Sequence, residues 1–199
     1  MIELKAPLRW ARRDDARSLA ELADQASYGL AFYHWSNVKQ PGQTPLDAGE
    51  ERAAREEGSF SYRNAMIAEL DGKCGACLIG YPQDEEPEPI DYDTMPAMLI
   101  PLQELENMAP KTWYVNVLAV YPEARNKGLG RLLLEAAERI ARNAGKSGLS
   151  LIAEDDNVNA IRFYHRFGFK NFATRPLISE GWKTRGENWI LMTKPLPAL

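Results

Sequence analysis

Apolar residues recur with helical spacing between residues 129 and 144. Leu129 and Ile140 fall on one face with five further apolar residues, and glutamate–arginine pairs lie four residues apart on the opposite face. This pattern predicts an amphipathic helix that Gly145 ends. The preceding segment, Val115 to Val120, is an apolar run typical of a buried strand. The sequence therefore predicts a strand, a short connection and a long helix.

Shorter patterns predict further elements on both sides of this strand and helix. Asp71 and Gly72 separate two apolar runs and predict the turn of an antiparallel hairpin. The strands that flank the long helix are expected to run parallel, so the sheet is mixed. The further strands are expected at 8–11, 62–70, 73–81, 149–153, 169–174 and 188–193. A first helix is expected to carry Ala16 to Ala23, with Asp14 or Asp15 as its cap. Further helices are expected at 48–57, within 96–108, where the helix is short, and at 157–167.

The composition is that of one globular domain spanning residues 1–199. Of these residues 45% are hydrophobic and 26% are charged, and no Ser/Gly-rich linker or repeat divides them. Residues 82–111 form an irregular insertion or flap with an acidic stretch at 84–93. A net charge of −4 excludes a general attraction to nucleic acid or to an anionic membrane. Without a signal-peptide pattern or a long apolar run, we expect a cytoplasmic protein.

Cys74 and Cys77 are the only cysteines, and their spacing suggests a redox pair or half of a zinc site. Residues three apart on a strand face opposite sides of a sheet. No second pair of cysteines or histidines supplies further zinc ligands. We therefore expect two buried or partly buried free thiols and no metal site.

The segment Arg125-Asn126-Lys127-Gly128-Leu129-Gly130-Arg131 joins the 115–120 strand to the long helix. Glycines allow close approach of the main chain to a ligand, and the first turn of a helix offers unpaired N–H groups and a positive dipole end. The junction therefore predicts an anion site that suits a phosphate-bearing cofactor. A dinucleotide fingerprint would need a third glycine at Leu133, and Gly145-Lys146-Ser147 lacks the earlier glycine of a P-loop at Ile140.

Two motifs in this region resemble those of the GNAT acetyltransferase superfamily. Arg125, Gly128 and Gly130 match its cofactor loop, in which Arg or Gln is followed by two residues, Gly, one residue, and Gly or Ala. The segment from Asn157 to Phe169 is similar to its second signature, which has Asn, an Ala three positions later, a Tyr four positions after that Ala, and a closing Gly-Phe. The resemblance covers residues 113–170, the expected cofactor-binding core.

The resemblance implies a single-domain α/β fold that binds acetyl-CoA. The implied sheet is mixed and mostly antiparallel, with about 6–7 strands, about 4–5 helices and a splayed parallel pair at the cofactor. Main-chain groups of the central strand would pair with the pantetheine arm, and the amide of Leu118 would polarise the thioester carbonyl. The cofactor-binding residues implied are Leu118, Ala119, Val120, Arg125, Asn126, Lys127, Gly128, Leu129, Gly130, Arg131, Asn157, Ala160, Phe163 and Tyr164.

The same resemblance makes Tyr164 the candidate proton donor to the departing thiolate. A general base is harder to assign, because the inward positions that carry glutamate in some relatives are Asn116 and Ile152 here. Asn116 is interpreted as a buried amide that is satisfied by hydrogen bonds or that orients a water or the acceptor. The candidates for the base are Glu154, Asp155, Asp156, Glu69, His34 or a chain of waters.

The leading hypothesis is an N-acetyltransferase acting on a small-molecule or peptide amine. The alternatives are a non-catalytic acyl-CoA-binding or sensing protein and, less well matched, a nicotinamide-dependent oxidoreductase. The aromatic segment Leu30 to Trp35 either lines the entrance for the acceptor or packs on the core. Trp189 to Met192 could form an edge strand through which a homodimer pairs, and a monomer is the alternative.

Overall fold

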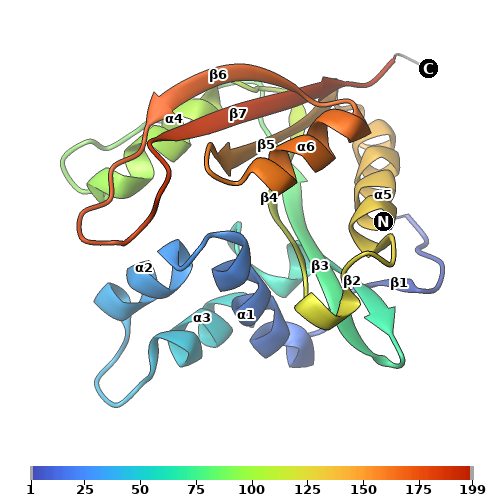
Figure 1. Ribbon diagram of the computed structural model, residues 1–199, viewed down its shortest axis with the longest axis horizontal. Coiled ribbons are helices and arrows are strands. Elements are labelled where there is room, and N and C mark those ends of the chain that lie inside the picture. Colours follow the sequence, from blue (N-terminus) through green and yellow to red (C-terminus); the bar gives the residue numbers. More distant parts are fainter. Residues whose placement is uncertain (1, 198–199) are drawn as a thin grey trace. The chain divides into compact units, whose positions relative to one another are not determined.

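The computed structural model describes residues 2–197, which form two compact units. One unit consists of residues 2–81 and 116–137, and the other of residues 82–115 and 138–197. Seven strands pair in the order β1-β2-β3-β4-β5-β7-β6 (Figure 1). β4, Thr112–Val120, contributes residues to both units. The predicted α/β class with a mixed sheet is confirmed.

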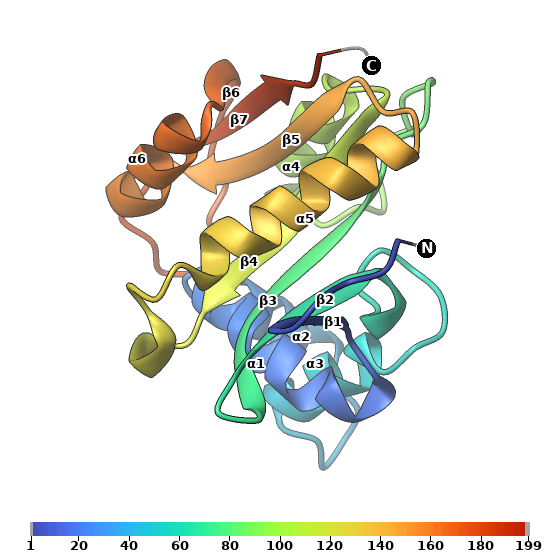
Figure 2. The same cartoon turned by 90° about the vertical axis from the view of Figure 1, so that its right-hand side faces the viewer.

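The first unit contains the amino-terminal antiparallel strands and three helices. β1 pairs with β2, and β2 pairs with β3, so the three strands lie side by side (Figure 2). The Asp71–Gly72 turn has positive φ at both residues, 52° and 75°, as the predicted tight hairpin requires. The elements are β1 (Leu8–Trp10), α1 (Ala16–Ala26), α2 (Leu30–Val38), α3 (Pro45–Ala53), β2 (Ala65–Leu70) and β3 (Lys73–Pro82).

α1 buries the face that its sequence predicts, with Leu19 and Leu22 fully buried. This face shares one hydrophobic cluster with Ile67 and Ile79 of the hairpin and with Val117 of β4. Burial of each leucine or isoleucine side chain contributes about 1.5–3 kcal/mol. The cluster therefore holds the helices of this unit on the strands.

α2 is a helix that the sequence pattern does not predict, and it raises the number of α-helices among residues 2–197 to six. Trp35 on α2 is buried, and it packs so closely on α3 that a Cβ at Gly49 would lie 2.5 Å from its ring. α3 begins earlier than expected because Thr44 caps it and Pro45 occupies its first turn. None of the helices in the described part of the chain has the length and apolarity needed to cross a membrane.

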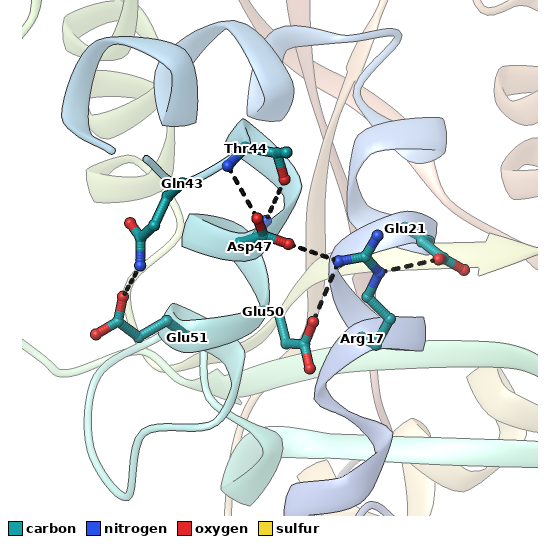
Figure 3. Close-up of polar contacts among 7 residues, drawn as sticks. All are labelled: Arg17, Glu21, Gln43, Thr44, Asp47, Glu50 and Glu51. Carbon is teal, nitrogen blue, oxygen red and sulfur yellow. Dashed lines mark hydrogen bonds and ion pairs between the residues drawn. The ribbon is translucent and has the colours of Figure 1, made fainter. Parts of the chain in front are cut away.

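Arg17 connects α1 to α3 through two carboxylates of α3, and it also contacts Glu21 on its own helix (Figure 3). Its guanidinium lies 3.1 Å from Asp47, 3.2 Å from Glu50 and 3.3 Å from Glu21. Asp47 also accepts the N–H of Thr44 in the capping box of α3. All four charged side chains are substantially exposed, so each pair contributes about 1 kcal/mol or less.

Asp15 is expected to cap α1, but its side chain makes no cap hydrogen bond. It accepts two hydrogen bonds from Arg9, at 2.7 and 2.9 Å, and Arg9 also pairs with Glu69 at 2.7 Å. Burial by itself would raise the pKa of Asp15, but the hydrogen bonds lower it overall. An ion pair between β1 and the start of α1 replaces the local cap.

Cys74 and Cys77 lie against the same hydrophobic cluster, so the prediction that they face opposite sides of the sheet is wrong. The β2–β3 ladder shifts register between Ala68 and Glu69, and Gly75 has no partner in it. The extra residue of such a bulge breaks the two-residue alternation. Both cysteines are free thiols, as expected, and burial raises the pKa of both, that of Cys74 to about 11.

The second unit is built on β5, β7 and β6. The first four residues of β4 pair in parallel with β5, from Thr112 opposite Gly148 to Val115 opposite Leu151. The hydroxyls of Thr112 and Ser150 share a buried hydrogen bond of 2.7 Å across this pair. The elements are α4 (Ile100–Asn107), β5 (Gly148–Glu154), α6 (Val158–Phe167), β6 (Lys170–Pro176) and β7 (Asn188–Pro195), while α5 (Leu129–Asn143) spans both units.

The segment 82–111 contains the short helix that the sequence predicts, α4, which contacts β5, β6 and β7 (Figure 1). Gln83 ties the beginning of this segment down, since its side chain donates to Glu106 at 2.6 Å and its carbonyl accepts from Lys146 at 2.6 Å. The acidic stretch 84–93 is mostly exposed.

β7 is an internal strand, with β5 on one side and β6 on the other. The expectation that Trp189 to Met192 forms an edge strand is therefore wrong, and with it the idea that two subunits pair through this strand. The error arises because strand order is not encoded in the apolar pattern of a single strand, and the last strand of the chain inserts between two earlier ones.

Candidate cofactor and catalytic sites

The turn between β4 and α5 is exposed from Arg125 to Gly128, and α5 begins at Leu129. Gly128 has a φ of 80°, and a Cβ at this position would meet no atom within 4 Å. Its backbone conformation, and not crowding, is therefore what favours glycine. Asn126 also has a left-handed φ of 61°, which asparagine tolerates better than most residues.

The amides of this turn are available to a ligand. The first hydrogen bond of the helical ladder runs from Leu132 N–H to the carbonyl of Gly128, at 3.1 Å. Within residues 2–197, the N–H groups of residues 126–131 donate to no protein acceptor. Exposed unpaired amides at the start of a 15-residue helix are suited to bind an anion. This arrangement fits the diphosphate that the sequence predicts here.

The three cationic side chains of the turn differ in their partners. Arg125 Nε donates to the carbonyl of Val120 at 3.3 Å, so this side chain folds back onto β4. Arg131 pairs with Glu135 one helical turn later, at 2.8 Å. Lys127 makes no ion pair within the described chain. Of the three, Lys127 is the charge most available to an incoming anion.

Asn116 is exposed, which corrects the expectation that its amide lies in a buried strand. Its neighbours Val115 and Val117 are buried on the other side of β4. On the same side as Asn116, Tyr114 is buried and Leu118 is half-buried, so the exposure is local to Asn116. Further along β4, Ala119 is buried in the core of the first unit, and Leu118 and Val120 are half-buried. The structure therefore leaves the side-chain amide of Asn116 accessible.

α6 begins and ends as its sequence predicts. The side chain of Asn157 accepts the N–H of Ala160 at 3.2 Å and caps the helix, and Gly168 ends it with a φ of 102°. Ala160 and Phe163 are half-buried on this helix. The second signature is thus a capped helix with fixed ends.

Tyr164 lies on the buried face of α6, with 9% of its surface exposed. Its ring is 5.6 Å from that of Phe163 and 5.8 Å from that of Phe169, the latter at an edge-to-face angle of 64°. The neighbouring Tyr114 is fully buried, and burial first, then the charges of Glu106 and Tyr164, raise its pKa. His165, the next residue on the helix, is exposed.

Glu154, at the end of β5, is a buried carboxylate with 5% of its surface exposed. Its Oε1 accepts the hydroxyl of Thr184 and the N–H of Gly186, the latter at 2.8 Å. Its Oε2 is buried and has no partner among residues 2–197. The sequence contains no signal for this arrangement, because Thr184 and Gly186 lie far along the chain in the connection between β6 and β7.

The other candidates for the base are occupied elsewhere or exposed. Asp155 accepts the N–H of Glu187 at 3.0 Å and the amide of Asn188 at 2.9 Å. Glu69 is paired with Arg9, and Asp156 is exposed. His34 is half-buried on α2, and burial, followed by the charge of Arg52, lowers its pKa. Among the acidic candidates, only Glu154 combines burial with an unpartnered oxygen in the described residues.

Comparison with known proteins gives one family for this chain. The model of the acetyltransferase (GNAT) family matches residues 29–169, well over half of the 199 residues. A mycothiol acetyltransferase of Rhodococcus opacus is 40% identical over 65 residues, which cover 33% of this chain and 21% of that protein. A streptothricin acetyltransferase of Streptomyces lavendulae is 34% identical over 80 residues, which cover 40% and 42% of the two chains.

The matches thus span about a fifth of the mycothiol enzyme, 21%, and less than half of the streptothricin enzyme, 42%. A crystal structure of an acetyltransferase shares the fold, with a TM-score of 0.65 and 20% identity over 96% of this chain and 99% of that one. The two signature motifs, the mixed sheet and the family match agree. The chain belongs to the GNAT acetyltransferase family.

Proposed function

We propose that this chain is an acetyl-CoA-dependent N-acetyltransferase that moves an acetyl group directly to a primary amine of a small molecule or peptide. The observation that carries the proposal is the exposed β4–α5 turn, whose amides have no protein acceptor within residues 2–197. Membership of the GNAT family supports it. The roles proposed below for individual residues come from the resemblance of the two motifs around Gly128 and Tyr164 to those of the family.

The diphosphate of the cofactor would be held by the amides of residues 126–131. Lys127 and Arg125 would add positive charge, and Arg131 would do so after exchanging its contact with Glu135. Main-chain groups of Leu118, Ala119 and Val120 would pair with the pantetheine arm. The resemblance of the second motif adds Asn157, Ala160 and Phe163 as proposed cofactor contacts.

Bound acetyl-CoA would supply a thioester, and the overall transfer forms a C–N bond, breaks the C–S bond and moves one proton from nitrogen to sulfur. Tyr164 is the proposed donor of the proton to sulfur, because its place in the second motif matches the family's tyrosine and its ring contacts hold the phenolic oxygen in one position. Its contribution to the rate is expected to be about 10²- to 10⁴-fold.

The acceptor nitrogen must be neutral before it attacks. At pH 7, deprotonation of an amine with a pKa near 10.4 costs about 4–5 kcal/mol, whereas an α-amine near 7.7–8.0 costs about 1 kcal/mol. The proposed proton acceptor is a water that the exposed side-chain amide of Asn116 orients.

The acceptor is proposed only as a class. The relatives reported above are named after two different compounds, mycothiol and streptothricin, and each matches over a part of its length. A small amine or a peptide amine is the class that the family resemblance implies.

Calorimetric titration with acetyl-CoA, alongside thermal shifts with acetyl-CoA and with NAD, tests the proposal. At 100 times its Kd, a ligand that binds only the folded state stabilises it by about 2.7 kcal/mol. Release of free thiol in the presence of an amine panel then tests transfer. Stabilisation by NAD alone would exclude the proposal, and acetyl-CoA binding without transfer to any amine would favour the non-catalytic acyl-CoA binder.

A further inference from the structure

Glu154 is satisfied on one side only. Oε1 receives the hydroxyl of Thr184 and the N–H of Gly186, whereas the buried Oε2 has no partner among the described residues. A buried carboxylate oxygen without a donor destabilises the folded protein, and such an atom in a native protein calls for an explanation. Oε2 can therefore accept a hydrogen bond from one further donor.

The carboxylate also lacks a counter-ion. No lysine, arginine or histidine within residues 2–197 forms an ion pair with Glu154. The connection between β6 and β7, residues 177–187, covers Glu154 and is called the covering segment below. Its cations Lys183 and Arg185 are exposed, while Trp182 is buried. The indole Nε1 of Trp189 is also buried without a partner among the described residues. A cation from outside the chain would satisfy Oε2 with a charge-assisted hydrogen bond.

The surroundings of Glu154 are aromatic. Glu154 lies directly opposite Trp189 in the β5–β7 ladder, which places both side chains on the same face of the sheet with their Cβ atoms about 5 Å apart. Trp189 stacks on Trp182, with ring centroids 5.9 Å apart and planes inclined by 4°. Indole rings beside a carboxylate favour an ammonium group over a neutral donor.

The covering segment is fitted to this carboxylate. A Cβ at Gly186 would collide with the side chain of Glu154, so only glycine lets its N–H approach Oε1 at 2.8 Å. The segment makes few backbone hydrogen bonds of its own, among them Trp182 N–H to Ser179 at 2.7 Å and Leu177 N–H to Glu187 at 2.9 Å. Access of a ligand to Oε2 therefore requires this segment to open locally.

We propose that Glu154 Oε2 binds an ammonium group of the acceptor that does not react, so that the preferred acceptors are small amines with a second positive charge. This rests on the proposed acetyltransferase function. The ammonium at Glu154 is not the reacting one, because a carboxylate partner stabilises the protonated amine and would oppose the loss of its proton. Glu154 then selects the acceptor, and deprotonation falls to a water.

The test compares 1,4-diaminobutane with n-butylamine, which have the same four-carbon chain but differ in charge. The wild-type protein should acetylate the diamine with a kcat/KM at least about 10-fold higher, because a hydrogen bond to a charged group contributes that much. Glu154→Gln keeps an oxygen for Thr184 and Gly186 but removes the charge. It should lower kcat/KM for the diamine about 10- to 100-fold, mainly through KM, and leave n-butylamine unchanged.

Asp156→Asn is the matched control. Asp156 lies two residues after Glu154, and its side chain is exposed and has no partner in the described chain, so the substitution removes the same charge outside the proposed ammonium site. Its diamine preference should equal that of the wild type. Acetyl-CoA affinity, measured by calorimetry, shows whether each variant is folded, and the wild-type preference tests the inference even if a variant fails to fold.

Four results would overturn the inference, each in a distinct way. Equal activity of the wild type on both amines removes the ammonium site and leaves the acetyltransferase intact. An equal fall in kcat for both amines in Glu154→Gln, with an altered pH profile, would make Glu154 a base. If Glu154→Gln had no effect, Oε2 would not bind the acceptor, and a buried water that bridges Oε2 and the indole N–H of Trp189 would explain both unpartnered atoms. If the wild type binds no acetyl-CoA, the proposed function fails first and the inference falls with it.

Discussion

Substitution of Gly128 by alanine separates the backbone strain of the β4–α5 turn from its role in binding. Gly128 has a φ of 80° and open space where a side-chain methyl would lie, so the folded state is destabilised by the left-handed conformation alone. That conformation costs an L-residue about 1–2 kcal/mol, which lowers Tm by roughly 2–8 °C in a chain of this size.

Gly42 provides a matched control in the connection between α2 and α3. It has a φ of 85°, and a Cβ there would also meet nothing within 4 Å. Gly42→Ala should therefore lower Tm by about the same amount as Gly128→Ala. Differential scanning calorimetry of the two variants compares these losses of stability directly.

Only Gly128→Ala should weaken acetyl-CoA binding. A shift of the turn that removes one hydrogen bond to a charged phosphate oxygen costs about 1.5–3 kcal/mol, or about 10- to 150-fold in Kd. Isothermal titration calorimetry with acetyl-CoA measures this difference. If Gly128→Ala and Gly42→Ala lost equal stability and both bound acetyl-CoA like the wild type, the reasoning that places the diphosphate on these amides would be refuted.

Three further predictions concern catalysis and stability. Tyr164→Phe should lower kcat by about 10²- to 10⁴-fold with an unchanged Kd for acetyl-CoA, as measured by thiol release and calorimetry. Because hydrogen bonds from Arg9 lower the pKa of Asp15 below its unfolded value of about 3.9, its contribution to stability is present above that pH and is lost as the pH falls through the folded-state pKa. Asp15→Asn should therefore be less stable than wild type at pH 7 in urea denaturation, and the difference should shrink toward pH 3. Gly49→Ala should lower the free energy of unfolding by about 1–3 kcal/mol, because the alanine methyl group would lie 2.5 Å from the ring of Trp35.

Each of these predictions has an outcome that contradicts it. Full turnover in Tyr164→Phe would remove this hydroxyl from catalysis. A constant stability difference between Asp15→Asn and wild type from pH 7 to pH 3 would show that the ion pair with Arg9 does not stabilise the fold through ionisation. Wild-type stability in Gly49→Ala would mean that Trp35 moves without cost, contrary to its 3% exposure.

Local features of the fold could be predicted from the sequence. The Asp71–Gly72 hairpin, the cap that Asn157 provides, the end of α6 at Gly168 and the apolar face of α1 all lie as expected. Each depends on residues within a few positions of one another, because caps, turns and the 3.6-residue period are set by local backbone geometry. For the same reason the two motifs around Gly128 and Tyr164 were sufficient to find the family.

Only the tertiary structure decided the features that depend on distant residues. The insertion of β7 between β5 and β6 is a matter of strand order, and the shared cluster around both cysteines follows from a bulge. The exposure of Asn116 depends on which segments pack beside β4. The partners of Glu154 come from a segment about 30 residues later in the chain. Whether a buried oxygen has a donor is settled by which segments pack together, and packing is the sum of many weak contacts that no single stretch of sequence contains.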